Sequence, residues 1–299
     1  LIEQITRSDT AANLLRVFHL QERLKSIGKH ASSQVLSHIH VVGAGVMGGD
    51  IAAVCALKGL RVTLQDQDRE RIAQAQGRAA KLFQRRLKDR RLVQAALDRL
   101  IPDPNGHGIA SADLVLEAIF ENADAKRSLY TTIEPLLKPG AILATNTSSL
   151  PLSELSLNVI NPQRLVGSHF FNPVSRMPLV EVVESELLAP DVRSTAYAFV
   201  NQIGKLPLPV KDSPGFLVNA VLAPYMLEAM RCVDEGLEPA TVDKAMVQFG
   251  MPMGPLELAD TVGLDIARDA GAQLSQQAVM PACLKSHLDR QELGRKTGQ

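Results

Sequence analysis

The sequence predicts an α/β fold in which a doubly wound, mostly parallel sheet is followed by an all-helical C-terminal domain. Between about residues 38 and 212, short β-branched or apolar runs alternate with longer stretches that suit helices, which is typical of βαβ units. After Pro214 the strand signal disappears and only helix-compatible stretches follow. A length of 299 residues, set against a usual domain size of roughly 150, also favours two domains.

The first 37 residues are predicted to form a helix and a linker. Ser8 and Asp9 are candidate N-caps, and a polar stretch over residues 28–33 ends the helix. A rough apolar stripe runs along it, formed by Leu14, Val17, Phe18, Leu20 and Leu24. Such a stripe is most often a docking element for a neighbouring domain, and a membrane-surface or calmodulin-like role is the minor alternative.

Strands and helices are then expected in alternation. The predicted strands are residues 39–42, 61–64, 114–116, 141–144, 165–167, 179–183 and 208–210, and the longest helical stretches between them are residues 69–99 and 124–137. The later helices are predicted at residues 216–235, 239–248, 255–270 and 272–289, separated by Gly and Pro. The predicted domains are therefore a linker helix over residues 1–37, an α/β domain over 38–212 and a helical domain over 213–299.

Composition excludes several classes of protein. Thirty-two Lys and Arg balance thirty-two Asp and Glu, so no net positive charge attracts the chain to nucleic acid or an anionic membrane. The apolar runs fall far short of the ~20 residues of a membrane helix, which predicts a soluble protein. Three scattered cysteines predict a reducing compartment, and the first residues do not resemble a signal peptide. The opening looks like a piece from the middle of a longer chain.

A glycine motif follows the first predicted strand. Gly43-Ala44-Gly45-Val46-Met47-Gly48 precedes a helix-compatible stretch, and Asp66 ends the next strand about 20 residues later. Gly43 allows a tight turn, Gly45 lets the backbone approach a pyrophosphate, and Gly48 lets the helix pack closely. Asp66 can accept hydrogen bonds from a ribose diol and would repel a 2′-phosphate. This context predicts a Rossmann-type domain that binds NAD rather than NADP, with an incidental glycine-rich turn as the alternative.

One histidine lies in an apolar run with a carboxylate nearby. His169 follows the strand run at 165–167, and Glu181 stands in the middle of an apolar strand run twelve residues later. A buried charge needs a partner, and a carboxylate on one imidazole nitrogen leaves the other to take a proton from an alcohol. The alternative is a pair with a purely structural role. The other histidines (19, 30, 38, 40, 107 and 287) are expected at the surface or in linkers, and no metal site is expected.

Further polar residues lie where strands of such a sheet end. Glu121 and Lys126 follow the third strand run, at a position that suits contact with cofactor or substrate but also suits ordinary surface charges. A cluster of small hydroxyl side chains over residues 145–149 follows another strand. Asn219 lies just past the predicted domain boundary, where ligands often bind. Each of these alone is more often a cap or turn residue.

The motifs together resemble the L-3-hydroxyacyl-CoA dehydrogenases. They are the glycine motif, residues 145–149, His169-Phe170-Phe171-Asn172-Pro173 with Glu181, residues 212–219, and Pro252-Met253-Gly254-Pro255, in that order and spacing. The resemblance implies that His169 is the general base, that Glu181 is its partner, and that Ser148 and Asn219 orient the substrate. It also implies NAD contacts at Gly43, Gly45, Val46, Met47, Gly48, Asp66, Glu121, Lys126 and Asn146.

The region before the glycine motif is similar to a linker in multifunctional enzymes of the fatty-acid oxidation complex alpha-subunit type. That resemblance rests on residues 6–13 and implies an acyl-CoA substrate, a cytoplasmic location of bacterial type (mitochondria or peroxisomes being alternatives) and a parent chain that associates with a thiolase subunit. A homodimer through the helical domain is also expected. One departure is Ala220, where the family frequently has Arg; this removes a charge beside Asn219.

The predicted reaction is NAD-dependent oxidation of (S)-3-hydroxyacyl-CoA to 3-oxoacyl-CoA in fatty acid β-oxidation. Two alternatives remain open. The first is that the chain is a dehydrogenase of a related small 3-hydroxy acid without a thioester. The second is that it is an inactive fragment that only binds NAD or coenzyme A. The intact set of Ser148, His169, Glu181 and Asn219 argues against the second alternative.

Overall fold

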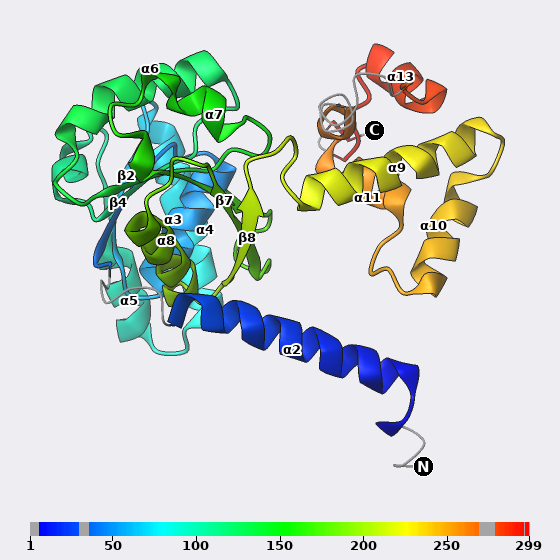
Figure 1. Cartoon of the computed structure of the whole chain (residues 1–299), viewed down its shortest axis with the longest axis horizontal. Coiled ribbons are helices and arrows are strands. Elements are labelled where there is room, and N and C mark those ends of the chain that lie inside the picture. The colour runs from blue at the N-terminus through cyan, green and yellow to red at the C-terminus, as the bar shows by residue number, and fades with distance from the viewer. Residues whose placement is uncertain (1–5, 30–35, 269–278, 296, 299) are drawn as a thin grey trace. The chain divides into compact units, whose positions relative to one another are not determined.

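An eight-stranded sheet forms the centre of the N-terminal part of the chain (Figure 1). The computed structural model describes residues 6–29, 36–268, 279–295, 297 and 298. The strands lie in the order β3 (Leu100–Pro102), β2 (Arg61–Gln65), β1 (His38–Val42), β4 (Leu114–Glu117), β5 (Ile142–Thr145), β6 (Leu165–Phe170), β7 (Leu179–Glu184) and β8 (Leu206–Lys211). All neighbours are parallel except β6 and β7.

The chain runs outward in opposite directions from the adjacent strands β1 and β4. This reversal is a topological switch point, and ligands of doubly wound sheets bind beyond the carboxyl ends of the strands at such a point. The glycine motif follows β1 and Glu117 ends β4, so both lie at that edge. The predicted fold class is confirmed.

The structure differs from the predicted elements at three places. The short strand β3 was not predicted, because it has only three residues, one of them proline, at the edge of the sheet. The predicted helix 69–99 is two helices, α4 (Arg69–Arg86) and α5 (Arg90–Arg99), because Leu87 is extended and Asp89 caps α5 by accepting from the Arg91 amide. The helix predicted at 255–270 is interrupted: α11 (Pro255–Val262) ends at Gly263, which has a φ of +114°, and residues 264–268 are helical again. Residues 269–278 of the predicted helices lie outside the described residues.

Both faces of the sheet are covered, and buried carboxylates lie on one of them. On one face, the apolar helix α3 (Val46–Leu57) packs on β1 and β2, and α8 (Pro190–Gln202) packs on β6, β7 and β8. Leu116 and Val182 belong to this apolar core. Because successive side chains of a strand alternate between faces, the neighbouring Glu117 and Glu181 point to the other face. That face is where α6 (Ala123–Ile133) brings polar partners to β4.

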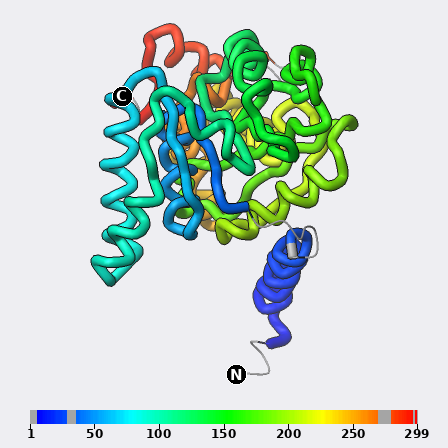
Figure 2. The backbone as a smooth tube through the Cα atoms, turned by 90° about the vertical axis from the view of Figure 1, so that its left-hand side faces the viewer, coloured from blue at the N-terminus to red at the C-terminus, as the bar shows by residue number. Residues whose placement is uncertain are grey.

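The N-terminal helix α2 (Asp9–Lys29) begins as predicted. The Ser8 side chain accepts a hydrogen bond from the Ala11 amide at 3.2 Å, as an N-cap does. The C-terminal part of α2 contacts α8 and β8, where Asn201 donates to the carbonyl of Lys25 at 2.9 Å. Its N-terminal part extends away from the sheet (Figure 2). The apolar side chains on it remain largely exposed, namely Leu14, Leu15, Val17, Phe18 and Leu20.

The C-terminal part of the chain is helical and forms a separate unit, Ser213–Gln299, which follows the unit Leu1–Asp212 in the sequence. It contains α9 (Val218–Asp234), α10 (Pro239–Phe249), α11 and α13 (Ala282–Asp289). Carboxylates of one helix cap the start of another: Asp243 on α10 accepts from the Leu256 and Glu257 amides of α11, and Asp234 on α9 accepts from the first amides of α13. None of the helices described is both long and apolar enough to cross a membrane.

The expectation that His38 and His40 are surface or linker residues is wrong. Both lie in β1 and are buried, and both hydrogen-bond to the hydroxyl of Thr63 on β2, at 2.9 and 2.8 Å. His40 also contacts Gln65 at 3.0 Å, and His38 contacts Ser111 at 3.2 Å. The sequence gave no sign that these two histidines are buried, because their hydrogen-bond partners come from distant segments of the chain.

We expect this pair to make folding sensitive to mild acid. Burial lowers the pKa of both His38 and His40 below the ordinary value of 6.5. The unfolded chain therefore takes up protons before the folded one does, and stability present above about pH 6.5 is lost as the pH falls through the lowered values. The midpoint of thermal unfolding should drop between about pH 7.5 and pH 5.5, and the drop should be smaller in His38→Gln/His40→Gln. An equal drop in both proteins would contradict this account.

Candidate active site

The glycine motif forms the turn between β1 and α3. Gly43 has a φ of +103°, and a Cβ there would lie 2.5 Å from the carbonyl oxygen of Ala118. A Cβ on Gly48 would lie 1.9 Å from the carbonyl oxygen of Gly43. A Cβ on Gly45, by contrast, would meet no atom within 4 Å. Gly43 and Gly48 are therefore required by the fold of the turn, whereas Gly45 keeps a space open beside the helix start.

This open space faces unpaired backbone donors. Gly45 is the N-cap of α3, and the first helical bond runs from the Gly49 amide to the Gly45 carbonyl, so the amides of Val46 and Met47 have no acceptor within the helix. Asp66, at the end of β2, accepts from the Ala44 amide at 2.8 Å and braces the turn. A helix N-terminus with free amides and a neighbouring carboxylate suits the pyrophosphate and ribose of a dinucleotide. The residues present therefore fit NAD.

Arg78 on α4 is a residue of this turn that the sequence did not indicate. Its guanidinium donates to the Gly45 carbonyl at 2.8 Å and to Asp50 at 3.2 Å. The contact fixes the residue whose missing side chain leaves the space open. No sequence motif marks Arg78, because it approaches the turn from a different helix.

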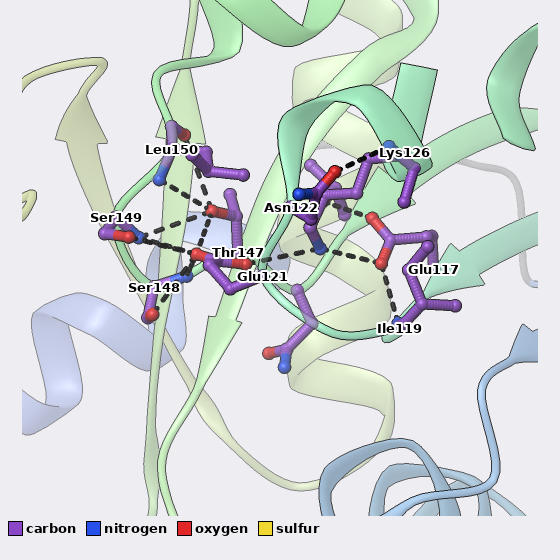
Figure 3. A network of polar contacts seen from close by, with 12 residues as sticks. Glu117, Ile119, Glu121, Asn122, Lys126, Thr147, Ser148, Ser149 and Leu150 are labelled. Carbon is purple, nitrogen blue, oxygen red and sulfur yellow. Dashed lines mark hydrogen bonds and ion pairs between the residues drawn. The ribbon is translucent and has the colours of Figure 1, made fainter. Parts of the chain in front are cut away.

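A network of polar contacts lies at the carboxyl ends of β4 and β5 (Figure 3). The Glu117 carboxylate accepts from the Lys126 ammonium, the Ile119 amide, and the hydroxyls of Tyr130 and Thr145, each at 2.7 Å. Glu117 and Lys126 have no exposed surface. The structure thus encloses Lys126, which was predicted to contact the cofactor, between two carboxylates, those of Glu117 and Glu121.

Glu121 holds the turn that carries Ser148. One of its carboxylate oxygens accepts from the Thr147 hydroxyl at 2.6 Å and from the amides of Ser148 and Ser149 at 2.8 and 3.1 Å (Figure 3). Burial opposes ionisation of Glu121, but the Lys126 charge and these hydrogen bonds outweigh it and hold its pKa below the ordinary range. Glu121 is therefore ionised near neutral pH and acts as a fixed acceptor for the turn.

The same turn is tied to the strand that carries His169. The backbone N–H of Asn146 donates to the backbone carbonyl of Glu117 at 2.7 Å, and the side-chain Oδ1 of Asn146 accepts from the backbone N–H of Phe170 at 2.9 Å. Asn146, predicted as a cofactor contact, thus links three strand ends. Ser148 and His169 are placed by one continuous set of hydrogen bonds.

His169 and Glu181 face each other across β6 and β7. The antiparallel register pairs the two residues, and the His169 Nδ1 lies 2.7 Å from the Glu181 carboxylate. Glu181 is fully buried and His169 nearly so, and the Phe171 ring packs on the imidazole with a centroid distance of 4.5 Å. A proton carried on Nδ1 is donated to the Glu181 carboxylate, which fixes the orientation of the imidazole ring. The arrangement suits a general base with a counter-charge behind it.

The remaining predicted site residue, Asn219, lies in the first turn of α9 in the second unit. Among the described residues, no group of three or more His, Cys, Asp and Glu is arranged to hold a metal ion. Besides Arg78, sequence analysis did not identify Glu117 and Tyr130, whereas Thr145 lies in the hydroxyl cluster over residues 145–149 that it did identify. The sequence did contain a signal for Glu117. This residue ends an apolar run, and a carboxylate in such a run needs a partner, as was argued for Glu181.

Comparison with known proteins gives a consistent result. The model of the 3-hydroxyacyl-CoA dehydrogenase NAD binding domain matches residues 38–213, and the model of its C-terminal domain matches residues 215–299. The chain is 38% identical over 265 residues to the fatty acid oxidation complex subunit alpha of Psychrobacter cryohalolentis, covering 87% of this chain. The match spans 37% of that relative, so the chain corresponds to little more than a third of its length.

Two solved structures of similar fold are 3-hydroxybutyryl-CoA dehydrogenases. The (S)-3-hydroxybutyryl-CoA dehydrogenase of Ralstonia eutropha is 32% identical with a TM-score of 0.85, covering 89% of this chain and 98% of that one. The 3-hydroxybutyryl-CoA dehydrogenase of Escherichia coli is 32% identical with a TM-score of 0.84, covering 89% of this chain and 59% of that one.

Proposed function

The chain belongs to the 3-hydroxyacyl-CoA dehydrogenase family of NAD-dependent oxidoreductases, and on that premise we propose that it catalyses the reversible oxidation of (S)-3-hydroxyacyl-CoA to 3-oxoacyl-CoA. The observation that carries this proposal is the His169–Glu181 pair near the carboxyl end of β6. The glycine turn lies at the carboxyl end of β1, at the same edge of the parallel part of the sheet. A base and a dinucleotide turn at one edge suit the oxidation of an alcohol.

In the proposed mechanism, His169 removes the proton of the substrate 3-hydroxyl at Nε2. Glu181, bonded to Nδ1, orients the ring and stabilises the imidazolium that forms, which lowers the cost of separating charge in a buried site. When bound, NAD supplies the hydride acceptor. The amides of Val46 and Met47 and the Asp66 carboxylate would hold its pyrophosphate and ribose. The chain therefore contributes placement and proton transfer rather than unusual reactivity.

Ser148 and Asn219 are proposed to orient the substrate by hydrogen bonds, and Glu121 and Asn146 to shape the cofactor side of the site. The support for Ser148 is its position in the turn that Glu121 and Asn146 fasten to β4 and β6. An acyl-CoA thioester is the proposed substrate class, in keeping with the names of the relatives. A cytoplasmic location of bacterial type, a homodimer through the helical unit and association of a longer parent chain with a thiolase subunit are further proposals from the family.

The proposal is tested by mixing the protein with acetoacetyl-CoA and NADH and following the loss of nicotinamide absorbance. Free acetoacetate in place of the thioester, and NADPH in place of NADH, are the controls. Turnover specific to the thioester and to NADH would support the proposal. Turnover of free acetoacetate would instead favour a dehydrogenase of small 3-hydroxy acids, and binding of NADH without turnover would favour a module that only binds.

Asp66→Ala is expected to weaken NAD binding and to relax discrimination against NADP. The variant removes the acceptor for the ribose hydroxyls, the charge that repels a 2′-phosphate, and the brace on the Ala44 amide. We expect the affinity for NADH to fall at least about tenfold, equivalent to ~1.4 kcal/mol, and the ratio of NADPH to NADH affinity to rise. Fluorescence titration with both nucleotides measures this. Unchanged NADH affinity would rule out the ribose role of Asp66.

A further inference from the structure

An arginine from a neighbouring helix holds the start of α3. Arg78 on α4 makes two contacts there: its Nη2 donates to the Gly45 carbonyl at 2.8 Å, and its Nε donates to the Asp50 carboxylate at 3.2 Å. Both side chains are partly exposed. The guanidinium therefore lies beside the glycine turn and remains within reach of solvent.

Gly49 makes room for this contact. A Cβ on Gly49 would lie 2.7 Å from Arg78 Nη2 and 2.7 Å from the Cβ of Ala75, which is also on α4. The guanidinium could move away, because it is the end of a flexible side chain, but Ala75 is fixed on its helix. The absence of a side chain at Gly49 thus lets α4 approach α3 closely enough for Arg78 to reach Gly45.

Holding the Gly45 carbonyl also directs an amide. The peptide group between Gly45 and Val46 is planar and trans, so the Val46 N–H points away from the carbonyl oxygen that Arg78 holds. Gly45 has no side chain with which to cap the helix, which leaves the Val46 and Met47 amides for a ligand. A glycine turn has much backbone freedom, and a constraint from outside the turn reduces the cost of ordering it on binding.

The charges at this end of α3 also suit an anion. Asp50 aligns the guanidinium, but alone it would place a negative charge about one helical turn from the free amides, where it would oppose a pyrophosphate. Arg78 offsets that charge. Within the described part of the chain, the guanidinium uses two of its five N–H groups, so donors remain for a bound anion or for water.

We propose that Arg78 is a positioning residue for the pyrophosphate of the bound dinucleotide. It fixes the Gly45 peptide and so aims the Val46 amide at the phosphate oxygens. Gly49 admits the guanidinium, and Asp50 aligns it. This role rests on the NAD site of the proposed function, but not on the identity of the substrate that is oxidised.

The first test compares two ligands of Arg78→Met by competition against NADH fluorescence. ADP-ribose carries the pyrophosphate, whereas adenosine lacks it but keeps the ribose diol that Asp66 would hold. We expect the affinities for NADH and ADP-ribose to fall roughly 5- to 30-fold, with the adenosine affinity within about twofold of the wild-type value. Equal losses for ADP-ribose and adenosine, or no loss for either, would overturn the positioning role.

The matched control is Arg99→Met. Arg99 on α5 also donates to a backbone carbonyl of α3, that of Ala56 at 3.0 Å, but Ala56 lies in the last turn of the helix. Both variants remove one cation and one bond to α3, so they differ in which end of α3 is released. The control should keep the wild-type affinity for all three ligands. A loss of ADP-ribose affinity equal to that of Arg78→Met would contradict the proposed role.

A second variant tests the same contact without changing Arg78. Gly49→Ala should displace the guanidinium from the Gly45 carbonyl and reproduce the selective loss of ADP-ribose affinity. Gly77→Ala is its control, because a Cβ on this glycine of α4 would meet no atom within 4 Å. The control should leave all affinities unchanged. Wild-type affinity for ADP-ribose in a folded Gly49→Ala protein would rule out the proposed contact.

A third measurement needs no ligand. In protein labelled with carbonyl-¹³C-glycine and ¹⁵N-valine, only the Val46 amide gives an HNCO signal, because Gly-Val occurs once in the sequence. Arg78→Met and Gly49→Ala should shift or broaden that signal, and Arg99→Met should leave it in place. An unmoved signal in both variants would overturn the structural link. Binding of NADH without turnover of acetoacetyl-CoA, together with the expected responses, would count against the proposed reaction and not against the role of Arg78.

Discussion

His169→Gln is expected to lose about 10²- to 10⁴-fold in kcat while it keeps its affinity for NADH. The imidazole that accepts the hydroxyl proton is removed, whereas the glycine turn and Asp66 lie on other strands and are untouched. The measurement pairs steady-state turnover of acetoacetyl-CoA with a fluorescence titration of NADH. Turnover near that of the wild-type protein would exclude His169 as the base.

Two comparisons sharpen this result. Glu181→Gln keeps a hydrogen-bonding side chain of the same size but removes the counter-charge of the imidazolium, so a large loss of turnover and a changed pH profile are expected with the ring still in place. His287→Gln is the matched control, because His287 pairs with Glu292 at 2.6 Å in an exposed setting. We expect the control to retain activity. An unchanged pH profile in Glu181→Gln would indicate a purely structural carboxylate.

Gly45→Ala is expected to abolish most NAD binding in a protein that still folds. The φ of −59° at Gly45 is accessible to any L residue, and the added Cβ meets no protein atom within 4 Å. The methyl group instead occupies the space beside the free amides of Val46 and Met47. We expect NADH affinity to fall at least about tenfold, or ~1.4 kcal/mol, with an unfolding midpoint close to that of the wild-type protein.

Gly48→Ala provides the contrast within the same turn. Its Cβ would lie 1.9 Å from a backbone oxygen, so the turn itself must move and thermal stability should fall together with NADH affinity. Calorimetry and nucleotide titration on both variants separate the two roles. Wild-type NADH affinity in folded Gly45→Ala would show that the dinucleotide does not approach this turn.

Several features of the site were predictable because one local pattern or one chemical requirement determines them. The glycine turn needs a strand, small residues and a helix in succession, all within a few residues of each other. Glu181 was singled out because a carboxylate in an apolar strand must find a partner. The same rule applies to Glu117, whose partner is Lys126. The sequence suggested that Lys126 contacts the cofactor, and the structure places its ammonium between two carboxylates.

Other features depend on segments that are far apart in the sequence. Whether His169 stands opposite Glu181 depends on the antiparallel register of β6 and β7, since a slip by one residue would turn one side chain to the other face. The burial of His38 and His40 depends on Thr63, Gln65 and Ser111. The contact of Arg78 with Gly45 depends on the packing of α4 on α3.

The sequence by itself determined the succession of strands and helices, the dinucleotide turn and the types of residue that carry the chemistry, because these follow from short-range periodicity, backbone sterics and motif spacing. Only the tertiary structure decided which charges are enclosed and which oxygen each donor meets. Burial and hydrogen-bond partners depend on several segments brought together, so Lys126 is enclosed between Glu117 and Glu121 only when β4, β5 and α6 are packed.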